Sequence, residues 1–391
     1  MRVLAKEIKV HLETKILPFW MNLKDGEYGG FYGQINYDLS IEKTADKGGI
    51  ATARFLWTYS SASRVLKEEK YLEMANHLYE FLKENIYDRE HGGIYWMVNY
   101  RGEPKDCRKH IYAQSFALYA LSEYYRITKS EEALQLALSI YQLMEDKGYS
   151  EANKGYLEEF DRKWNPMPNE MLSEDDVIAD MTMNTHIHIL EAYTNLYQAY
   201  PNEKLKQRLE RLLAIHYEKI YDESTKFLHV FFDNKWNSIV KKKSFGHDIE
   251  ASWLINKALN AISLQNPKYD EMVLDIAYNI ANCAIAKDGA ILNEEVDGVV
   301  DRTRIWWVQA EAMVGFLNAW ERTADKRWKH HMKELWRYIQ DNIVDPREKG
   351  EWFWSVKPSG KPIERPIGEP WKTSYHNGRF CLEFIERVLY K

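Results

Sequence analysis

Histidines with a second polar residue one helical turn away stand out among the side chains that could do chemistry. His247 is followed by Glu250 at spacing i, i+3, and His376 is followed by Arg379 at the same spacing. Residues three or four apart share one face of a helix, so each pair would present its two side chains together. An imidazole titrates near pH ~6.5 and can take up and return a proton at neutral pH. The two pairs therefore suggest general acid/base catalysis.

Two further pairs have helical spacing. Asn184 and His188 are i, i+4, and so are Trp307 and Glu311. His186 lies two residues before His188, and residues two apart point to nearly opposite sides of a helix. The His186–His188 pair is therefore a poor metal chelate, and we expect only one of these two histidines to face a site.

Two opposed imidazoles suit proton transfer at a carbon next to a carbonyl group. A helix N-terminus disfavours imidazolium and keeps such a base neutral, while helix N-termini and Arg54 would stabilise an enediolate. Glycoside hydrolysis would need two carboxylates, for which Glu250 and Glu311 are candidates, but the polar set is richer in histidine. The sequence contains no HExxH, GxGxxG or GxxxxGK[ST] motif, so we expect neither a metal nor a cofactor.

The elements that must position these residues are helices. Apolar residues recur at i, i+3, i+4 and i+7 in twelve segments, which predicts an all-α fold. The predicted helices are 2–17, 48–66, 70–86, 110–127, 130–146, 182–199, 203–218, 246–262, 268–285, 304–322, 325–342 and 374–388.

Short stretches with Gly, Asp or Asn near their turns predict β-hairpins between these helices. They lie near 28–38, 92–102, 155–160, 227–232, 289–293 and 351–360. The unit of helix, hairpin and helix recurs six times at a spacing of roughly 58–72 residues.

A closed ring of six helix pairs would bury every apolar stripe. We therefore predict a single domain, 1–391, that is an (α/α)6 barrel with six inner and six outer helices and short β-hairpins at the active-site mouth. Long charged faces place 70–86, 130–146 and 203–218 outside. An open solenoid is the structural alternative, but it would leave the first and last helices without partners, whereas a ring pairs them.

Parallel inner helices bring their first turns together at one mouth of such a ring. Polar side chains occur within about the first two turns of all six predicted inner helices. They are Arg54; His110, Tyr112 and Gln114; Asn184 and His188; His247 and Glu250; Trp306, Trp307 and Glu311; and His376 and Arg379. We expect the remaining histidines to be surface or packing residues.

Composition narrows the partners. The chain has 53 Lys and Arg against 59 Asp and Glu, a net charge of −6, and no basic stripe, so nucleic acid is not expected. It has no run of ~18 apolar residues and no signal-peptide pattern, so we expect a cytoplasmic protein without membrane contact. Three dispersed cysteines fit a reducing compartment and are expected to be packing residues. The 14% aromatic content modestly favours a sugar site.

Four segments together resemble the N-acylglucosamine 2-epimerase superfamily and are most similar to its cellobiose 2-epimerase branch. They are Gly246-His247-Asp248-Ile249-Glu250, Trp306-Trp307-Val308-Gln309-Ala310-Glu311, Asn184-Thr185-His186-Ile187-His188 and Tyr375-His376-Asn377-Gly378-Arg379. The resemblance covers essentially the whole chain. It implies a cofactor-independent (α/α)6 barrel that converts the reducing-end glucose of cellobiose, lactose and related β-1,4-linked disaccharides to mannose.

The resemblance also implies roles for residues. His247 and His376 would be the general acid/base pair on opposite faces of C2, and His188 would assist ring opening or hold the substrate. Arg54 and Glu250 would contact the reacting sugar and tune the bases. The residues expected to line the sugar subsites are Tyr112, Asn184, Trp306, Trp307, Glu311 and Trp371.

Other functions fit the same scaffold. A monosaccharide aldose–ketose isomerase or an N-acylglucosamine 2-epimerase would lack room for a second sugar beside Trp371 and the 164–182 loop. A toroidal glycosidase or lyase would need a carboxylate pair across the bore, and a sugar-binding protein would not need opposed histidines. The expected partner is a small disaccharide, and the chain is expected to be a monomer or weak homodimer.

Overall fold

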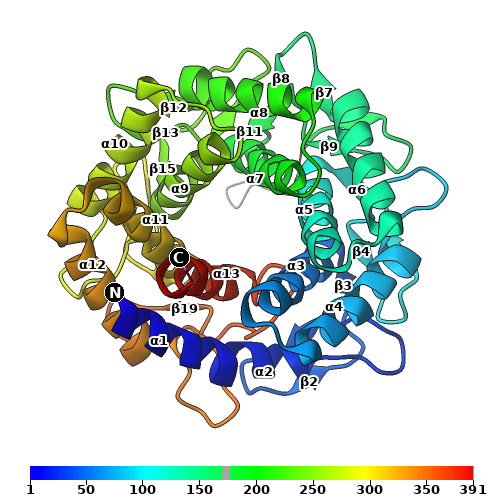
Figure 1. Ribbon diagram of the computed structural model, residues 1–391, viewed down its shortest axis with the longest axis horizontal. Helices are drawn as coiled ribbons and strands as arrows, with labels where there is room; N and C mark the ends of the chain where they lie inside the picture. The colour runs from blue at the N-terminus through cyan, green and yellow to red at the C-terminus, as the bar shows by residue number, and fades with distance from the viewer. Residues whose placement is uncertain (170–176, 391) are drawn as a thin grey trace.

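The computed structural model describes residues 1–169 and 177–390, which form a closed double ring of helices (Figure 1). The inner ring contains α3 (Gly49–Leu66), α5 (Ile111–Thr128), α7 (Met183–Ala199), α9 (Phe245–Ala261), α11 (Trp306–Thr323) and α13 (Tyr375–Phe384). The outer ring contains α1 (Arg2–His11) with α2 (Leu17–Met21), α4 (Glu69–Phe81), α6 (Glu131–Leu143), α8 (Glu203–Ile215), α10 (Pro267–Cys283) and α12 (Lys326–Tyr338). The predicted (α/α)6 barrel is confirmed.

Four outer helices continue into a wider turn, in which an N–H bonds to the carbonyl five residues earlier. These turns are Leu82–Ile86, Met144–Gly148, His216–Ile220 and Ile339–Ile343. A similar turn, Leu12–Ile16, joins α1 to α2, so the first helical segment runs beyond its predicted end at residue 17. Pro18 does not stop it because proline lies in the first turn of α2, where a missing N–H costs little.

The ring closes where the first and last helices meet. α1 packs against α13, and the blue and red ends of the chain lie side by side in Figure 1. The Trp352 indole N–H donates to His11 Nε2 at 2.8 Å, which joins the last repeat to α1. This contact between the chain ends excludes the open solenoid.

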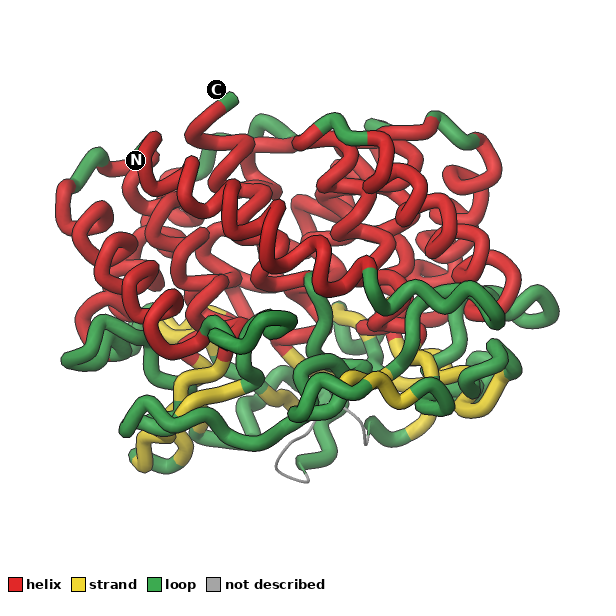
Figure 2. The backbone as a smooth tube through the Cα atoms, turned by 90° about the horizontal axis from the view of Figure 1, so that it is seen from below, coloured by secondary structure: helices red, strands yellow, loops and turns green. Residues whose placement is uncertain are grey.

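The strands lie at one end of the ring, which we call the strand end (Figure 2). The strand that directly precedes an inner helix pairs with a strand of the next repeat along the chain. Among the described residues, it does not pair with a strand of its own repeat. The pairs are β3 (Lys47–Gly48) with β4 (Met97–Val98), β6 (Lys109–His110) with β9 (Glu159–Phe160), β11 (Met181–Thr182) with β14 (Phe231–Phe232), β15 (Lys242–Ser244) with β16 (Glu294–Val296), and β18 (Arg304–Ile305) with β19 (Ser355–Val356). A single bridge between Ile35 and Gly368 joins the first repeat to the last.

Local hairpins form as well, but they are shorter than predicted. They are β1 (Gln34–Ile35) with β2 (Ile41–Glu42), β4 with β5 (Pro104–Asp106), β7 (Tyr149–Ser150) with β8 (Gly155–Tyr156), β12 (Tyr221–Asp222) with β13 (Phe227–Leu228), and β16 with β17 (Val299–Asp301); β10 (Pro166–Met167) extends the sheet at β9. The glycine-containing segment at Gly30 makes a tight turn instead of a strand. A Cβ on Gly30, which has φ +64°, would lie 2.6 Å from the Phe81 ring.

One ion pair recurs at the start of four inner helices. It joins a basic residue just before the helix to an acidic residue of the preceding loop: Lys47 to Asp25 at 2.6 Å, Lys109 to Asp88 at 3.0 Å, Arg304 to Asp288 at 3.0 Å, and Lys372 to Glu351 at 2.8 Å. The lysine side chains of these pairs are buried. Each pair therefore fixes the level at which the inner helix begins, and with it the position of the first-turn side chains.

The structure bears on two expectations drawn from composition, one about the cysteines and one about membrane-spanning segments. Cys381 is buried as expected, but Cys283 is exposed and Cys107 is half-buried, so the packing role predicted for all three cysteines is wrong for Cys283. Within residues 1–169 and 177–390, none of the helices combines the length and the apolar character needed to span a bilayer.

Candidate active site

The first turns of the inner helices converge at the strand end of the bore and bring three predicted histidines together. The Trp307 ring contacts both His247 and His376, with ring centroids 4.7 and 5.5 Å apart. Burial, and then the charges of Arg379, Arg54 and the neighbouring histidines, lower the pKa of His376 well below its usual value. His247 and His376, which the resemblance implies are the acid/base pair, thus both contact the Trp307 indole.

Glu311 holds His376 from behind. Its carboxylate lies 2.7 Å from Nδ1 of His376, and it also accepts from the Trp253 indole N–H at 3.1 Å. A carboxylate accepts hydrogen bonds, so this contact places a proton on Nδ1 and leaves Nε2 with its lone pair. Glu311 is fully buried. It therefore orients a histidine, and its predicted place at a sugar subsite stays a prediction.

Glu191 plays the same part for His188, and sequence reasoning missed it. Its carboxylate lies 2.9 Å from Nδ1 of His188 and accepts from the Tyr375 hydroxyl at 2.7 Å. The signal was available, because Glu191 is three residues after His188 on α7. His186, by contrast, bonds to backbone groups at Thr182 and Tyr156, so only one of the two histidines faces the bore, as expected.

Arg379 occupies the centre of the site's charged groups. Its buried guanidinium pairs with Glu191, Glu250 and Glu311. Burial opposes ionisation of Glu191, but the adjacent Arg379 lowers its pKa to about 2. Burial and the nearby Glu311 instead raise the pKa of Glu250 to about 7. One guanidinium thus keeps Glu191 ionised, while Glu250 titrates near neutrality.

Glu250, Glu311 and His376 offer three ligand atoms within 4.8 Å of one another, which is a spacing that could suit a metal ion. The Arg379 guanidinium pairs with both carboxylates. A divalent cation there would lie beside this fixed positive charge and be repelled by it. The two carboxylates are therefore better suited to the Arg379 guanidinium than to a metal ion.

His247 is held differently from the other two histidines. It lies in the first turn of α9, half-buried, with Nδ1 2.7 Å from the Ser244 hydroxyl. Burial, and then the nearby His188 and Lys242, lower its pKa to about 3, so the ring is neutral at pH 7. Gly246 allows Trp307 to lie against the helix, because a Cβ at this position would be 2.5 Å from the indole.

Arg54 reaches the same region from α3. It donates to the Tyr112 hydroxyl at 2.9 Å and to the Trp371 carbonyl at 3.0 Å. Its guanidinium also lies over the rings of Phe116 and Tyr375, at 4.3 and 5.1 Å from their centroids. Trp371 is half-buried and packs near Tyr112, which places an aromatic surface beside the cation.

Five buried polar atoms of the site have no hydrogen-bond partner among the described residues. They are Nε of Arg54, Oδ1 of Asn184, Oε2 of Glu250, Nε1 of Trp306 and Nε of Arg379. Buried polar groups are nearly always satisfied in folded proteins. A ring of donors and acceptors of this kind matches the hydroxyl groups of a sugar.

Two residues of the predicted polar set are structural. Gln114 binds both backbone groups of Ile94, and His110 caps α5 by accepting from the Tyr112 backbone N–H at 3.2 Å. Part of the 164–182 loop, residues 170–176, lies outside the described residues. The loop's predicted proximity to a second sugar therefore stays a prediction.

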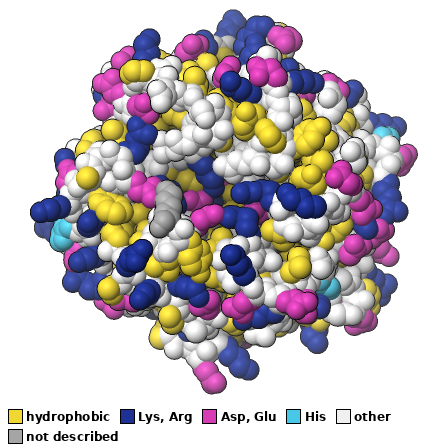
Figure 3. Space-filling model, viewed as in Figure 1, with side chains coloured by type: hydrophobic (Ala, Val, Ile, Leu, Met, Phe, Trp, Pro, Cys, Tyr) yellow, Lys and Arg dark blue, Asp and Glu magenta, His cyan; other side chains and the backbone are white. Residues whose placement is uncertain are grey.

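A hollow of about 910 Å³ opens at the end of the bore opposite the histidines, which we call the far end. Its walls include Arg64, Asn256, Lys257, Asn318 and Glu383. Figure 3 shows this face, where Lys, Arg, Asp and Glu side chains surround the central hollow. None of the three site histidines lines it.

Comparison with known proteins places the chain among carbohydrate epimerases. Residues 30–378 match the family described as N-acylglucosamine 2-epimerase. The chain is 46% identical to a cellobiose 2-epimerase of Dictyoglomus turgidum, over 99% of this chain and 100% of that protein. It is 54% identical to the solved structure of a cellobiose 2-epimerase from Bacillus thermoamylovorans, with a TM-score of 0.98 over 99% of this chain and 100% of that chain. A D-mannose isomerase structure shares the fold, with 19% identity and a TM-score of 0.87 over 98% of each chain.

Proposed function

We infer, because the chain belongs to the N-acylglucosamine 2-epimerase family, that this carbohydrate epimerase is a cellobiose 2-epimerase. It interconverts glucose and mannose at the reducing end of β-1,4-linked disaccharides such as cellobiose and lactose. High identity to cellobiose 2-epimerases over the full chain supports this substrate class. The D-mannose isomerase likeness, at 19% identity, speaks only for the fold.

The proposed reaction moves one proton at C2. After the sugar ring opens, one imidazole removes the C2 proton with its Nε2 lone pair, and a planar cis-enediolate forms beside Arg54. Rotation about C2–C3 presents the other face, and the second imidazole, after taking up a proton from solvent on Nε2, gives that proton to C2. The first imidazole then releases its proton to solvent. His247 and His376 are the two bases, because both contact the Trp307 indole from different helices.

The remaining residues of the site hold and polarise the sugar. His188, held by Glu191, assists ring opening, and Arg54 stabilises the negative charge of the enediolate. Glu250 and Asn184 offer acceptor atoms to hydroxyl groups, with Trp306, Trp307, Trp371 and Tyr112 as aromatic walls. The same enediolate protonated at C1 gives a ketose, so slow isomerisation accompanies epimerisation.

One observation supports this assignment above the others. Three histidines from three inner helices meet at one mouth, and each has an oxygen at Nδ1: Ser244 for His247, Glu311 for His376 and Glu191 for His188. The two carboxylates select the tautomer in which Nε2 is the base, and the Ser244 hydroxyl, which can accept or donate, is compatible with it. The imidazole that removes a proton from carbon must be neutral and in that form.

The test is NMR of lactose in deuterated water with metal-stripped protein. The wild type is expected to replace the C2 hydrogen with deuterium and to form epilactose without splitting the disaccharide. His247→Ala and His376→Ala should each abolish epimerisation, whereas His330→Ala, an exposed change on α12, should not. Epimerisation that persists in either of the first two variants contradicts the two-base scheme, and faster turnover of mannose than of lactose favours the monosaccharide alternative.

Further proposals concern the location of the protein in the cell, its domain organisation and its oligomeric state. We propose a cytoplasmic location, which the free cysteines Cys107, Cys283 and Cys381 support. We also propose one domain over residues 1–391 and a monomer or weak homodimer, for which size-exclusion chromatography with light scattering is the direct measurement.

A further inference from the structure

Ser244 stands at the N-cap of α9 but does not cap the helix. A serine or threonine at this position usually accepts a hydrogen bond from the backbone N–H two or three residues later. Thr182 does so at α7, where it accepts from Thr185 N at 3.1 Å, and Ser130 does so at α6, where it accepts from Ala133 N at 3.3 Å. No side-chain cap bond forms at α9.

The Ser244 hydroxyl instead faces the side chain of His247, the residue three positions later whose backbone N–H a capping serine would bind. Its Oγ lies 2.7 Å from Nδ1 of His247. The helix therefore gives up a capping bond, which is typically worth about 1 kcal/mol, for a contact to one imidazole nitrogen. Because the residue contacted is one of the two proposed bases, this contact indicates that Ser244 has a role in the chemistry rather than in stability.

The contact has a defined chemical consequence. A neutral imidazole carries its proton on Nδ1 or on Nε2, and the hydrogen bond at one nitrogen decides which. A hydroxyl can accept or donate here, and in the arrangement that we propose Oγ accepts from Nδ1–H, so that Nε2 keeps its lone pair and can take a proton from carbon. Glu311 does the same for His376. The two bases therefore have supports of different strength, a neutral hydroxyl for one and a carboxylate for the other.

We propose that Ser244 is a positioning residue that holds His247 in the tautomer and rotamer needed for proton transfer at C2. The proposal rests on the proposed epimerase function and adds a residue to it. Ser244 contacts His247 and acts through it. The other proposed base, His376, contacts the Trp307 ring, which in turn contacts His247.

Two substitutions test the proposal. Ser244→Ala is expected to lower kcat for epimerisation by about 10–100-fold, as losses of supporting hydrogen bonds commonly do, with KM changed by less than ~2-fold. Ser244→Thr keeps the hydroxyl and should restore most of the rate. Ser130→Ala is the matched control, because it removes a true cap: it should lower the melting temperature and leave kcat unchanged.

Deuterium partitioning separates positioning from general damage. When only His247 is impaired, His376 still removes a proton from the epimer that faces it, exchanges that proton with solvent and returns deuterium to the same face. In Ser244→Ala, one epimer should therefore exchange its C2 hydrogen at nearly the wild-type rate while epimerising about 10–100-fold more slowly. The other epimer should lose exchange and epimerisation together.

The outcomes are distinguishable. If wild-type protein exchanges neither epimer, the proposed epimerase function itself fails. If the wild type is active but Ser244→Ala lowers exchange equally for both epimers, or leaves all rates unchanged, the positioning role of Ser244 is wrong.

Discussion

Arg379 is the residue on which the charge balance of the site depends. Its guanidinium is fully buried and bonded to Glu191, Glu250 and Glu311. Through Glu191 and Glu311 it reaches two of the three histidines without contacting the bore itself. A buried cation of this kind needs an ionised partner, and Glu191, whose pKa is lowered to about 2, supplies one.

Glu191→Gln tests this dependence. The change keeps the shape of the side chain but removes one negative charge from Arg379, and breaking a buried ion pair costs about 3–5 kcal/mol. We expect a loss of stability of that order in urea unfolding together with a lower kcat. Glu123→Gln is the control, because Glu123 is an equally buried partner of Arg64 and Arg126 at the far end. It should reduce stability similarly and leave kcat unchanged; a similar fall in kcat would contradict the assignment of Glu191 to the site.

Gly246 gives a second prediction at this scale. In Gly246→Ala the new methyl group would lie within 2.5–2.7 Å of Trp307 and Val308, so the indole must shift away from His247 and His376. A displacement of about 1 Å can cost roughly 100-fold in rate, and we expect kcat/KM to fall about 10–100-fold with helix content unchanged. Gly26→Ala, where nothing lies within 4 Å, should behave as wild type. Wild-type kinetics in Gly246→Ala would show that Trp307 does not position the bases.

At the scale of elements, the strands and buried ion pairs fix where each inner helix begins. The segment before α13 is the clearest case. Lys372 donates to Glu351 at 2.8 Å and to the Ile367 carbonyl at 2.9 Å, and its neighbour Trp371 provides the carbonyl that binds Arg54. Anchoring this segment therefore also places a cation of the active site.

Lys372→Met is predicted to affect folding and binding together. It leaves Glu351 buried without its cation, which should destabilise the protein by about 3–5 kcal/mol. Because the Trp371 carbonyl is then less well placed for Arg54, we also expect a higher KM for lactose. Lys154→Met removes an exposed partner of Glu151 and should change neither the melting temperature nor KM. A stable Lys372→Met variant with wild-type KM would show that the ion pair is dispensable.

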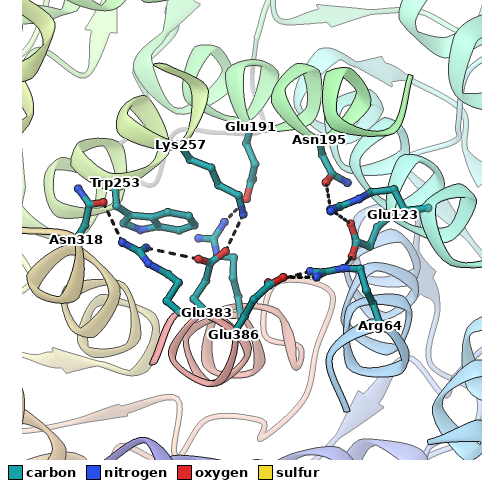
Figure 4. Close-up of polar contacts among 12 residues, drawn as sticks. Arg64, Glu123, Glu191, Asn195, Trp253, Lys257, Asn318, Glu383 and Glu386 are labelled. Carbon is teal, nitrogen blue, oxygen red and sulfur yellow. Dashed lines mark hydrogen bonds and ion pairs between the residues drawn. The ribbon is translucent and has the colours of Figure 1, made fainter. Parts of the chain in front are cut away.

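The whole molecule is a ring joined at both ends of the bore. At the strand end, pairs between successive repeats and the Ile35–Gly368 bridge complete the circle. At the far end, polar contacts join the inner helices to one another, three of them between neighbours and one between α9 and α13, which are separated by α11 (Figure 4). They include Arg64 with Glu123 at 2.6 Å, Arg126 with Asn195 at 3.1 Å, Asn256 with Asn318 at 2.8 Å, and Lys257 with Glu383 at 2.7 Å. The charges lining the far hollow largely satisfy one another.

Buried histidines outside the site make the stability of the whole ring depend on pH. His216 is fully buried, and burial lowers its pKa to about 4. Between pH ~6.5 and ~4 the unfolded chain binds a proton at this residue and the folded chain does not, so its contribution to stability falls as the pH is lowered. His216→Gln removes that contribution.

Urea unfolding at several pH values measures the effect. The free energy of unfolding of His216→Gln, relative to wild type, should rise by a slope of about one proton as the pH falls from ~6 to ~4. For His330→Gln, an exposed change, the difference should stay constant. A constant difference for His216→Gln as well would mean that the ring takes up its proton as readily in the folded state as in the unfolded chain.

The sequence by itself determined the helices, their order and their closure into a ring. Helical periodicity is local, so a stretch such as 111–128 shows its character without its partners, and the unpaired ends at 2–17 and 374–388 required each other. It also predicted which helix ends bear His188, His247 and His376, because a repeat of fixed length places equivalent turns at one mouth.

Only the tertiary structure decided how those residues are connected. Strand partners lie about fifty residues apart in successive repeats, so the local sequence pattern predicted hairpins, which form only as short pairs, and missed the pairing between repeats. Glu311 has the residue type of a sugar ligand, but burial against Arg379 and His376 makes it a support. Ser244 has the residue type of a helix cap, yet its hydroxyl faces an imidazole. Such choices depend on which groups three-dimensional packing leaves within hydrogen-bonding distance, and no spacing along the chain encodes that.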